Sequence, residues 1–395
     1  MLKQNHRAWV EIDLAAVKHN VRQLKRLLAP STELMAVVKA DAYGHGCIGV
    51  SQAALESGAT WLGVATIPEG IQLRNAGITA PIVILGATNS SNEIGTIAEY
   101  RLQPTICNPK QALVFHEVLL EKSATKLLEK LPVHLSIDTG MSRLGTNWRS
   151  AVEFVRLVQS LPQLEIASVY SHLATADDRD QSILRLQQQR FEQVIADLKA
   201  AGINPPRLHL CNSAGMLTDR QLHYDMVRPG LALYGLHPAP HLRTSVDLRP
   251  VMQVKARITQ VKSIEAGTGV SYGHSFHAAQ DMRIATVAIG YADGIPRGLS
   301  NRISVALHGK IIPQIGTITM DQTLIDVSAV PSAEVGDVVT FLGHAELSPD
   351  LNVDKWAEIL GTISWEILCG FKHRLPRICI NQPDPVSYQA ISKLS

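Results

Sequence analysis

Two patterns of apolar and polar positions alternate along the first two-thirds of the chain. Asp13 can cap a helix whose apolar residues keep helical spacing from Leu14 to Leu28, before Pro30 ends it. Further on, short apolar runs that predict buried strands are separated by amphipathic stretches such as Ala53–Ser57, Pro109–Leu120, Trp148–Val158 and Asp180–Ala200. There are about eight of these runs, at Leu34–Val38, Trp61–Thr66, Ile82–Leu85, Leu102–Ile106, Val133–Ile137, Ile166–Tyr170, Arg207–Cys211 and Met226–Val227.

This alternation predicts a parallel sheet with right-handed crossovers, and about eight repeats is the number that closes a barrel. After about Pro240 the runs become short, rich in Val, Ile and Thr, and separated by Gly, Asp or Pro turns, which predicts an all-β domain. We therefore expect an N-terminal α/β barrel of the (β/α)8 TIM type over residues 1–240 and a C-terminal mostly-β domain over residues 241–395. The segment before Asp13 is a candidate strand of the β domain.

The β domain should contain several strands, one late helix at Val353–Leu360, and a loosely held tail beyond Ile380. Its strands are predicted at Met252–Val261, Arg283–Ile289, Ile303–Leu307, Ile311–Ile315, Thr323–Val327 and Asp337–Leu342.

Composition narrows the classes of function. The chain has 37 Lys and Arg against 35 Asp and Glu, a net charge of +2, so we expect neither nucleic acid nor a membrane as partner. The five cysteines are scattered without a CxxC pair, which favours reduced thiols. No apolar signal segment begins the chain and no run approaches the ~20 residues that span a bilayer, so we expect a cytoplasmic protein.

Polar residues follow several of the predicted barrel strands. In a parallel α/β barrel the chemistry lies at the carboxyl ends of the strands. Those ends carry Lys39, Asp138 with Arg143, Ser171 with His172, Asn212 with Ser213, and Arg228 with Gly230. This set predicts a locally cationic rim that suits a phosphorylated, carbonyl-bearing ligand and a carboxylate, and the free amine of a buried lysine can form a Schiff base.

Simpler interpretations exist for each of these features. Lys39 alone could be an ordinary lysine at a strand end. The run from Gly44 to Gly49 matches GxGxxG with Glu69 ~20 residues later, which would indicate a dinucleotide site, but the first glycine lies too far from the strand. Asp138-Thr139-Gly140 occurs once, whereas an aspartic protease needs two such triplets. The 15 histidines show no metal-binding spacing, so we expect no metal, with most of them at the surface or at helix ends.

Taken together, several segments resemble the bacterial alanine racemases, which are fold-type III pyridoxal phosphate enzymes. The matching segments occur in the family's order over nearly the whole chain: VVKADAYGHG (37–46), DTGMSRLG (138–145), SHLATAD (171–177), HLCNSAG (209–215), VRPGLALYG (227–235), VSYGHSF (270–276), GYADGIPR (290–297), GTITMDQT (316–323) and ISWEILCGFKHRLPR (363–377). The resemblance implies a barrel followed by a β domain, pyridoxal 5'-phosphate as cofactor, and a homodimer whose active sites are shared between subunits.

The resemblance also implies roles for individual residues. Lys39 would hold the cofactor, and Arg228 would face its ring nitrogen with His172 behind it. The other cofactor-binding candidates are Tyr43, Asn212, Ser213, Trp365 and the backbone of Gly230 and Leu231. Tyr272, supplied by the second subunit, would be the second acid/base residue, and Arg143 with the backbone of Met320 would receive the substrate carboxylate.

The implied chemistry is consistent with these residue types. Racemisation removes the α-proton from one face of an amino acid and returns a proton to the other, so two acid/base groups must flank Cα. Lys39 would act on the D-enantiomer and Tyr272 on the L-enantiomer. A phenol is a poor base at neutral pH, so nearby cations would have to favour the phenolate. A guanidinium only donates, so Arg228 would leave the ring nitrogen unprotonated and suppress transamination.

Three positions depart from the family's usual pattern. Ser136 replaces a lysine, often carbamylated, that orients the carboxylate-binding arginine, so Arg143 needs another partner. Thr317 replaces a common arginine, and Trp365 replaces a tyrosine that reaches the phosphate. These departures bear on turnover and affinity.

Other functions remain open at this level. Racemases of serine or of a broader range of amino acids share much of the residue set. A non-catalytic pyridoxal phosphate carrier resembles the barrel but lacks a β domain, and a barrel decarboxylase would carry an acidic residue in place of Arg228. The leading expectation is an alanine racemase, an isomerase that supplies D-alanine for peptidoglycan.

Overall fold

Eight parallel strands close into a barrel in one of the two units of the chain. The computed structural model describes residues 6–123, 130–343, 348, 351–371 and 373–381. One unit, here called the barrel unit, comprises residues 16–42 and 47–249. The other, called the β unit, comprises residues 1–15, 43–46 and 250–395.

The barrel contains strands from all eight predicted apolar runs. Pairing β10 with β2 and β5 with β6 closes the ring, and a short strand β7 (Thr146–Asn147) pairs parallel with the end of β6. The ring consists of β2 (Glu33–Val37), β3 (Trp61–Val64), β4 (Ile82–Ala87), β5 (Gln103–Ile106), β6 (Leu131–Asp138), β8 (Leu164–Tyr170), β9 (Leu208–His209) and β10 (Met226–Val227). The predicted fold class is confirmed for this unit, with strand ends shifted by a few residues.

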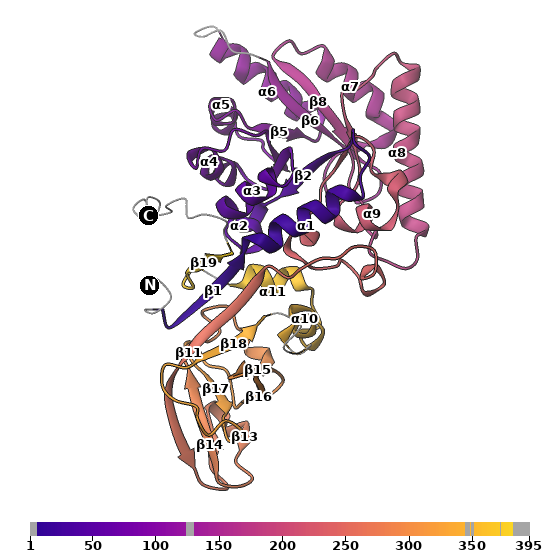
Figure 1. The fold of residues 1–395 in the computed structure, drawn as a ribbon. Coiled ribbons are helices and arrows are strands. Elements are labelled where there is room, and N and C mark those ends of the chain that lie inside the picture. Colours follow the sequence, from indigo (N-terminus) through magenta and orange to yellow (C-terminus); the bar gives the residue numbers. More distant parts are fainter. Residues whose placement is uncertain (1–5, 124–129, 344–347, 349–350, 372, 382–395) are drawn as a thin grey trace. The chain divides into compact units, whose positions relative to one another are not determined.

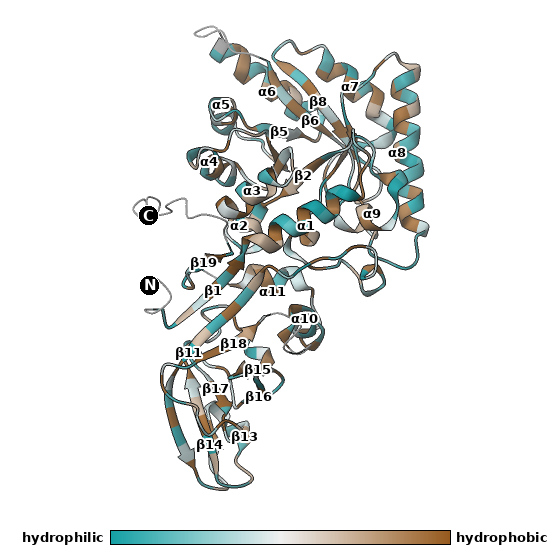
Figure 2. Ribbon diagram, in the orientation of Figure 1, coloured by the Kyte–Doolittle hydropathy of each residue, from teal (hydrophilic) through white to brown (hydrophobic). Residues whose placement is uncertain are grey.

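Helices surround the barrel because each crossover must cover the apolar outer face of two neighbouring strands (Figure 1). Figure 2 shows mixed polar and apolar residues on the outer helices α7 and α8. Local signals set several ends: Thr66 and Glu69 form a capping box at the start of α4, with Pro68 in its first turn. The helices are α1 (Leu14–Arg26), α3 (Cys47–Glu56), α4 (Ile67–Asn75), α5 (Ser91–Glu99), α6 (Pro109–Ser123), α7 (Ala151–Gln159), α8 (Ser182–Ala200) and α9 (Ser213–Thr218).

The β unit is built around one long strand, β11 (Met252–Ile264). Its first half pairs with β18 and its second half with β14, so six strands form a closed ring of pairings in the order β14-β17-β16-β15-β18-β11. The other members are β14 (Met282–Val287), β15 (Ser304–Leu307), β16 (Lys310–Ile315), β17 (Thr323–Asp326) and β18 (Val338–Leu342). All six strands lie where the short runs rich in Val, Ile and Thr predicted them.

Both ends of the described chain join this sheet. β1 (Ala8–Asp13) pairs antiparallel with β11, Trp9 opposite Lys255, and parallel with β19 (Arg377–Ile380) on its other side. Two helices, α10 (Val353–Leu360) and α11 (Ser364–Gly370), precede β19. The predicted loose tail lies almost wholly outside the described residues.

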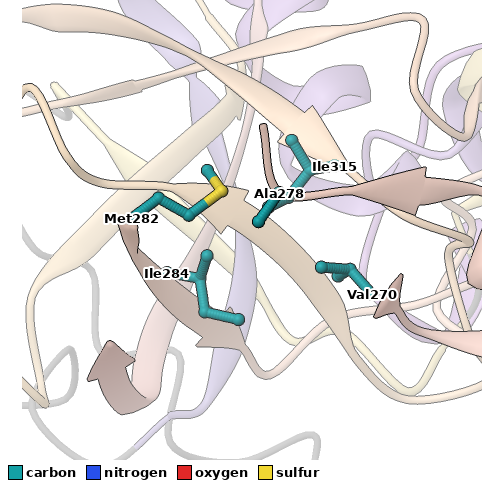
Figure 3. Close-up of a cluster of buried hydrophobic side chains, with 5 residues drawn as sticks. All are labelled: Val270, Ala278, Met282, Ile284 and Ile315. Atoms are coloured by element: carbon teal, nitrogen blue, oxygen red, sulfur yellow. The ribbon is translucent and has the colours of Figure 1, made fainter. Parts of the chain in front are cut away.

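A small hydrophobic cluster supports one edge of the β unit (Figure 3). Its buried members are Val270, Ala278, Met282, Ile284 and Ile315. Val270 belongs to β12 (Gly269–Val270), which pairs with β13 (Phe276–His277), and Phe276 packs against the cluster, so both strands that flank the segment 271–275 contact it. Among the described residues, no helix is long and apolar enough to cross a membrane.

Candidate functional site

Lys39 leaves its strand through a left-handed turn. It follows β2 directly and begins α2 (Lys39–Tyr43), in which Ala40 to Tyr43 all have φ between 52° and 55°. Four consecutive residues without glycine in this conformation are strained, so neighbouring groups must hold them. The Ala40 N–H donates to Glu69 Oε1 at 2.8 Å, and the Cys47 N–H donates to Asp41 Oδ1 at 2.8 Å. The direction in which Lys39 leaves the barrel is therefore fixed by backbone strain and two carboxylates.

The same contacts exclude the dinucleotide interpretation of Gly44–Gly49. The sheet is a closed barrel and has no switch point for a dinucleotide. Glu69, which would have bound a ribose, instead accepts from the N–H groups of Ala40, Ala65 and Thr66 at 2.7 to 3.2 Å.

Arg228 is the buried cation of the barrel. Its side chain lies just beyond β10 with the residue only 3% exposed, and its guanidinium donates to carbonyls of Ser171 (2.8 Å) and Leu210 (3.0 Å). It also donates to His209 Nδ1 at 2.7 Å and to His172 Nδ1 at 3.2 Å. Its Nε–H makes no hydrogen bond to any residue that the structure describes. All four contacts use the two Nη atoms, so the Nε–H is available to a ligand.

His172 is surrounded by the other candidate cations of the barrel. Burial, together with the nearby charges of Arg228, Arg143 and Lys39, lowers its pKa to about 3. The prediction of a cationic rim was therefore wrong for this residue, since the imidazole is neutral at neutral pH. Because Arg228 donates to Nδ1, the His172 proton is on Nε2 and is available to a further acceptor.

Ser213, Gly230 and Leu231 lie together where β9 and β10 end. The buried Ser213 Oγ accepts from the N–H groups of Gly230 (2.9 Å) and Ala232 (3.3 Å), so its own proton remains to be donated. Leu231 is buried, and its N–H bonds to none of the described residues. Asn212 caps α9 by accepting from the Gly215 N–H at 2.9 Å. Asn212 therefore holds the turn that places Ser213.

Arg143 is exposed and lacks the partner that a lysine at position 136 would provide. Within the described parts of the chain it makes no side-chain hydrogen bond or ion pair. Ser136 is buried and faces the barrel interior: burial raises the pKa of Tyr170, and hydrogen bonds with Thr105 and Ser136 oppose that rise. Ser136 therefore hydrogen-bonds to Tyr170 and does not orient Arg143. The direction of the Arg143 side chain is set only by its own backbone.

In the β unit, Tyr272 lies on a strained and firmly bonded loop. The residue is 73% exposed, and positive φ values at Ser271 (62°), Gly273 (71°) and His274 (45°) surround it. Val270, which directly precedes the loop, belongs to the buried cluster of Figure 3, and Thr317 hydrogen-bonds to the loop itself. An exposed phenol on a rigid loop is suited to act on something outside its own unit.

Thr317 is the residue that ties this loop down. Its Oγ1 donates to the Tyr272 carbonyl at 2.8 Å and lies 3.0 Å from Ser275 Oγ, while its carbonyl accepts from Ser271 Oγ at 2.7 Å. The buried threonine therefore contacts three of the five loop residues. Thr317 stands where the family commonly has an arginine, and in the sequence this looked like the loss of a functional residue. In the structure it provides the hydrogen bonds that hold the loop.

The other predicted site residues of the β unit take different positions. Met320 is 53% exposed in a turn. Its carbonyl accepts from the Ala292 N–H at 3.0 Å, and its own N–H bonds to no described residue. Trp365 is half-buried on α11. Tyr43 is buried, and burial together with the nearby Cys369 thiol raises its pKa.

Sequence reasoning missed two histidines inside the barrel. We expected most histidines at the surface, but His134 and His209 are fully buried on β6 and β9. Burial and the charges of Arg207 and Arg228 lower the pKa of His134 to about 3, and burial lowers that of His209 strongly. The available signal was a histidine flanked by apolar residues in a run predicted to be a strand.

Both units match one protein family. The family model for the alanine racemase N-terminal domain matches residues 12–238, and that for the C-terminal domain matches residues 251–379. The chain belongs to the alanine racemase family.

Alanine racemases of other organisms match the chain almost from end to end. One from a Nostoc species is 60% identical over 374 residues, covering 95% of this chain and 96% of that protein. One from a Synechocystis species is 57% identical over 380 residues, covering 96% and 100%. The crystal structure of alanine racemase from Streptomyces lavendulae superposes with a TM-score of 0.87 at 37% identity, covering 95% and 97%. The expected class of enzyme, an amino-acid racemase, is thereby confirmed.

We expect Thr317→Val to loosen the Tyr272 loop of this family member. Valine keeps the shape but removes the hydroxyl, which costs about 1 kcal/mol. Amide hydrogen exchange in residues 271–275 should become about fivefold faster. Thr317→Ser, which keeps Oγ, is the matched control and should exchange like the natural protein. Equal protection in the valine variant would contradict the assigned anchor.

The buried histidines should make the protein sensitive to acid. Unfolded imidazoles bind protons below about pH 6.5, whereas His134 and His172 have pKa values of about 3 in the folded state. The unfolded chain therefore binds more protons between these limits, so stability is present above pH 6.5 and falls as the pH drops. Each histidine should contribute a slope of about 1.4 kcal/mol per pH unit. Urea unfolding from pH 7 to 5 measures it, and a flat profile would exclude neutral buried imidazoles.

Proposed function

We propose that this protein is a pyridoxal phosphate-dependent racemase that interconverts L- and D-alanine. The observation that carries the proposal is identity of 60% to an alanine racemase across both domains. The geometry supports it, because Lys39, Arg143 and Arg228 are close enough to His172 for their charges to lower its pKa. This proximity supports a site in which an amine and two guanidinium groups surround one region of the barrel.

The residues present fit a phosphate group. A phosphate accepts hydrogen bonds only, and the turn at Ser213 and Leu231 offers a hydroxyl proton and a buried backbone N–H without a described partner. Tyr43 and Trp365 would add an O–H and an N–H donor from residues of the β unit. The buried Leu231 N–H, which has no described partner, is costly to bury unless a ligand accepts from it.

Arg228 fits the ring nitrogen of the same cofactor. Its Nε–H, which has no described partner, suits an unprotonated aromatic nitrogen, while four contacts of the Nη atoms hold the guanidinium in place. When bound, pyridoxal phosphate would stabilise the negative charge that develops on Cα after a proton is removed. A guanidinium can donate a hydrogen bond to the ring nitrogen but does not transfer its proton to it. The ring then stays unprotonated and stabilises the negative charge on Cα only moderately.

Two residues of this chain would move the proton. Lys39 would remove it from the D-enantiomer and Tyr272 from the L-enantiomer, and each would return a proton on its own face. His172 supports the second role, because its Nε2–H can donate to a phenolate while its low pKa keeps it from taking up a proton itself. The charges of Lys39, Arg143 and Arg228 would favour the phenolate as well.

The substrate carboxylate would bind Arg143 and the Met320 N–H. Neither group is bonded to another described residue, so both are available to a carboxylate. Arg143 can bind it with two parallel hydrogen bonds. The substrate would therefore be oriented through the contacts that its carboxylate makes with Arg143 and the Met320 N–H.

The active site would be shared between two copies of the chain. Tyr272 (73%), Met320 (53%) and Tyr291 (42%) are exposed apolar or aromatic residues of the β unit, and the Tyr291 N–H donates to the neighbouring Thr319 carbonyl. Exposed aromatic groups on firmly bonded turns are typical of protein interfaces. A homodimer would bring these residues to the barrel of the second subunit.

The product D-alanine would serve peptidoglycan synthesis in the cytoplasm. This part of the proposal follows from the reaction, since cell-wall peptides need the D-enantiomer and amino-acid precursors are joined inside the cell.

Racemase activity should depend on both acid/base residues. The purified protein should form D-alanine from L-alanine, as measured by D-amino acid oxidase, and L-serine in parallel tests the substrate range. Lys39→Ala should lose the yellow cofactor absorbance and at least ~10³-fold in kcat, whereas Tyr272→Phe should lose activity but keep the colour. A protein that binds the cofactor without racemising alanine would instead support a carrier.

Mixing the two variants tests the shared site. Heterodimers of Lys39→Ala with Tyr272→Phe contain one site with both natural residues, so activity should recover to about a quarter of the natural level, as expected for random pairing. Lys39→Ala mixed with the double variant Lys39→Ala, Tyr272→Phe is the control and should stay inactive. No recovery in proven heterodimers would exclude sharing.

Replacing Arg228 should change the products. In Arg228→Glu a carboxyl group can share a proton with the ring nitrogen, so L-alanine should transfer its amino group to the cofactor as a side reaction. Without an added amino acceptor this should release up to one pyruvate per active site alongside D-alanine, and more when free pyridoxal phosphate is supplied to replace the aminated cofactor. Arg228→Gln, which cannot supply that proton as an acid, should be slower without forming pyruvate. Lactate dehydrogenase measures the pyruvate, and its absence from the glutamate variant would refute this role.

A further inference from the structure

A line of hydrogen bonds crosses the barrel interior beneath Arg228. Arg228 donates to His209 Nδ1 at 2.7 Å, and His209 Nε2 lies 2.7 Å from Ser168 Oγ. Ser168 Oγ lies 2.6 Å from His134 Nδ1, and His134 Nε2 lies 2.9 Å from Gln103 Oε1. His209, Ser168, His134 and Gln103 lie on the successive strands β9, β8, β6 and β5 of the ring, and Arg228 directly follows the neighbouring β10.

The first residue decides the direction of every bond in this line. A guanidinium cannot accept, so His209 Nδ1 must carry a lone pair and the ring proton must be on Nε2. Nε2–H therefore donates to Ser168 Oγ. Ser168 Oγ has no other partner among the described residues, so its proton goes to His134 Nδ1. His134 then has its proton on Nε2 and donates to the Gln103 carbonyl oxygen.

The surroundings keep both imidazoles neutral. Burial comes first, and the positive charges of Arg228 and Arg207 add to it, so the pKa values of both His134 and His209 lie well below the ordinary value. No carboxylate contributes to either shift. A proton on either ring would reverse a bond and place two donors face to face.

The rings are also held in their planes. Tyr170 stacks on His209 with centroids 4.8 Å apart and an angle of 10°, and Arg228 lies over the Tyr170 ring at 5.1 Å. His134 meets His209 edge-on at 6.2 Å and Trp61 at 5.7 Å. A flip of the His209 ring, which would exchange its two nitrogens, is blocked by this packing.

We propose that Gln103, His134 and Ser168 are positioning residues for Arg228, acting through His209 as a one-way line of hydrogen bonds that fixes the guanidinium. They touch neither substrate nor cofactor. Their effect is to hold His209 as a pure acceptor toward Arg228, so that the free Nε–H of Arg228 keeps a constant direction. The functional part of this proposal rests on the proposed racemase activity, whereas the proton positions do not.

The proton positions can be measured in the full-length holoenzyme. With ¹⁵N-labelled histidine, the ring nitrogens of His134 and His209 should report neutral rings protonated on Nε2 from pH 6 to 9, with signals assigned by His134→Asn and His209→Asn. Ser168→Ala should change the His134 signals. A charged ring, or an Nδ1–H on either histidine, would overturn the proposal whether or not the protein racemises alanine.

Kinetics separates positioning from simple loss of stability. Ser168→Ala should lower kcat for alanine about tenfold and change KM less than about twofold, because Arg228 does not bind the substrate carboxylate. Thr32→Val is the matched control: it also removes a buried hydroxyl of the barrel unit, one that donates to the Tyr224 carbonyl at 3.1 Å, but it lies off the line. It should leave kcat within about twofold of the natural value.

Two further variants complete the test. Ser168→Thr keeps the hydroxyl and should restore most of kcat. In an Arg228→Gln background, Ser168→Ala should cost less than about twofold, because the residue through which it acts is gone. An equal loss in Ser168→Ala and Thr32→Val, or a full tenfold loss in the Arg228→Gln background, would reject positioning through Arg228.

Discussion

A buried guanidinium is the constraint around which the barrel interior is arranged. Taking a charge out of water is costly unless every donor finds an acceptor, and Arg228 brings five N–H groups into a closed barrel. Two carbonyls and two imidazole nitrogens accept from it. Because Arg228 can never accept, it dictates where its neighbours carry their protons. The charge of one residue therefore determines the chemistry of several others.

In the β unit, the structure holds the Tyr272 phenol rigidly while leaving it exposed. A loop with three residues of positive φ would relax without support. Support comes from the apolar cluster under Val270 and from Thr317, whose hydroxyl and carbonyl both bond to the loop. A rigid exposed side chain loses little conformational entropy when it meets a partner.

Much of this architecture could be predicted from the sequence. Apolar runs gave the barrel strands because a strand buried on both faces needs several consecutive apolar residues, as at Ile82 to Leu85. The family motifs named the site residues, whose roles remain proposals. The neutral state of His172 could not be predicted, because it depends on charges brought near by distant parts of the chain. The same holds for Thr317 and for the line from Gln103 to Arg228, which are contacts between residues far apart in sequence.

The pairing of β1 has a consequence for biosynthesis. β1 is translated before both strands that pair with it, which begin at Met252 and Arg377. At ~5–20 residues per second, its second neighbour emerges on the order of 20–75 seconds later. Every residue of the barrel is translated before β19, so the barrel can close while this apolar strand still has an open edge. β1 therefore stays incompletely paired until both partners have been made, and a nascent chain needs protection at this strand.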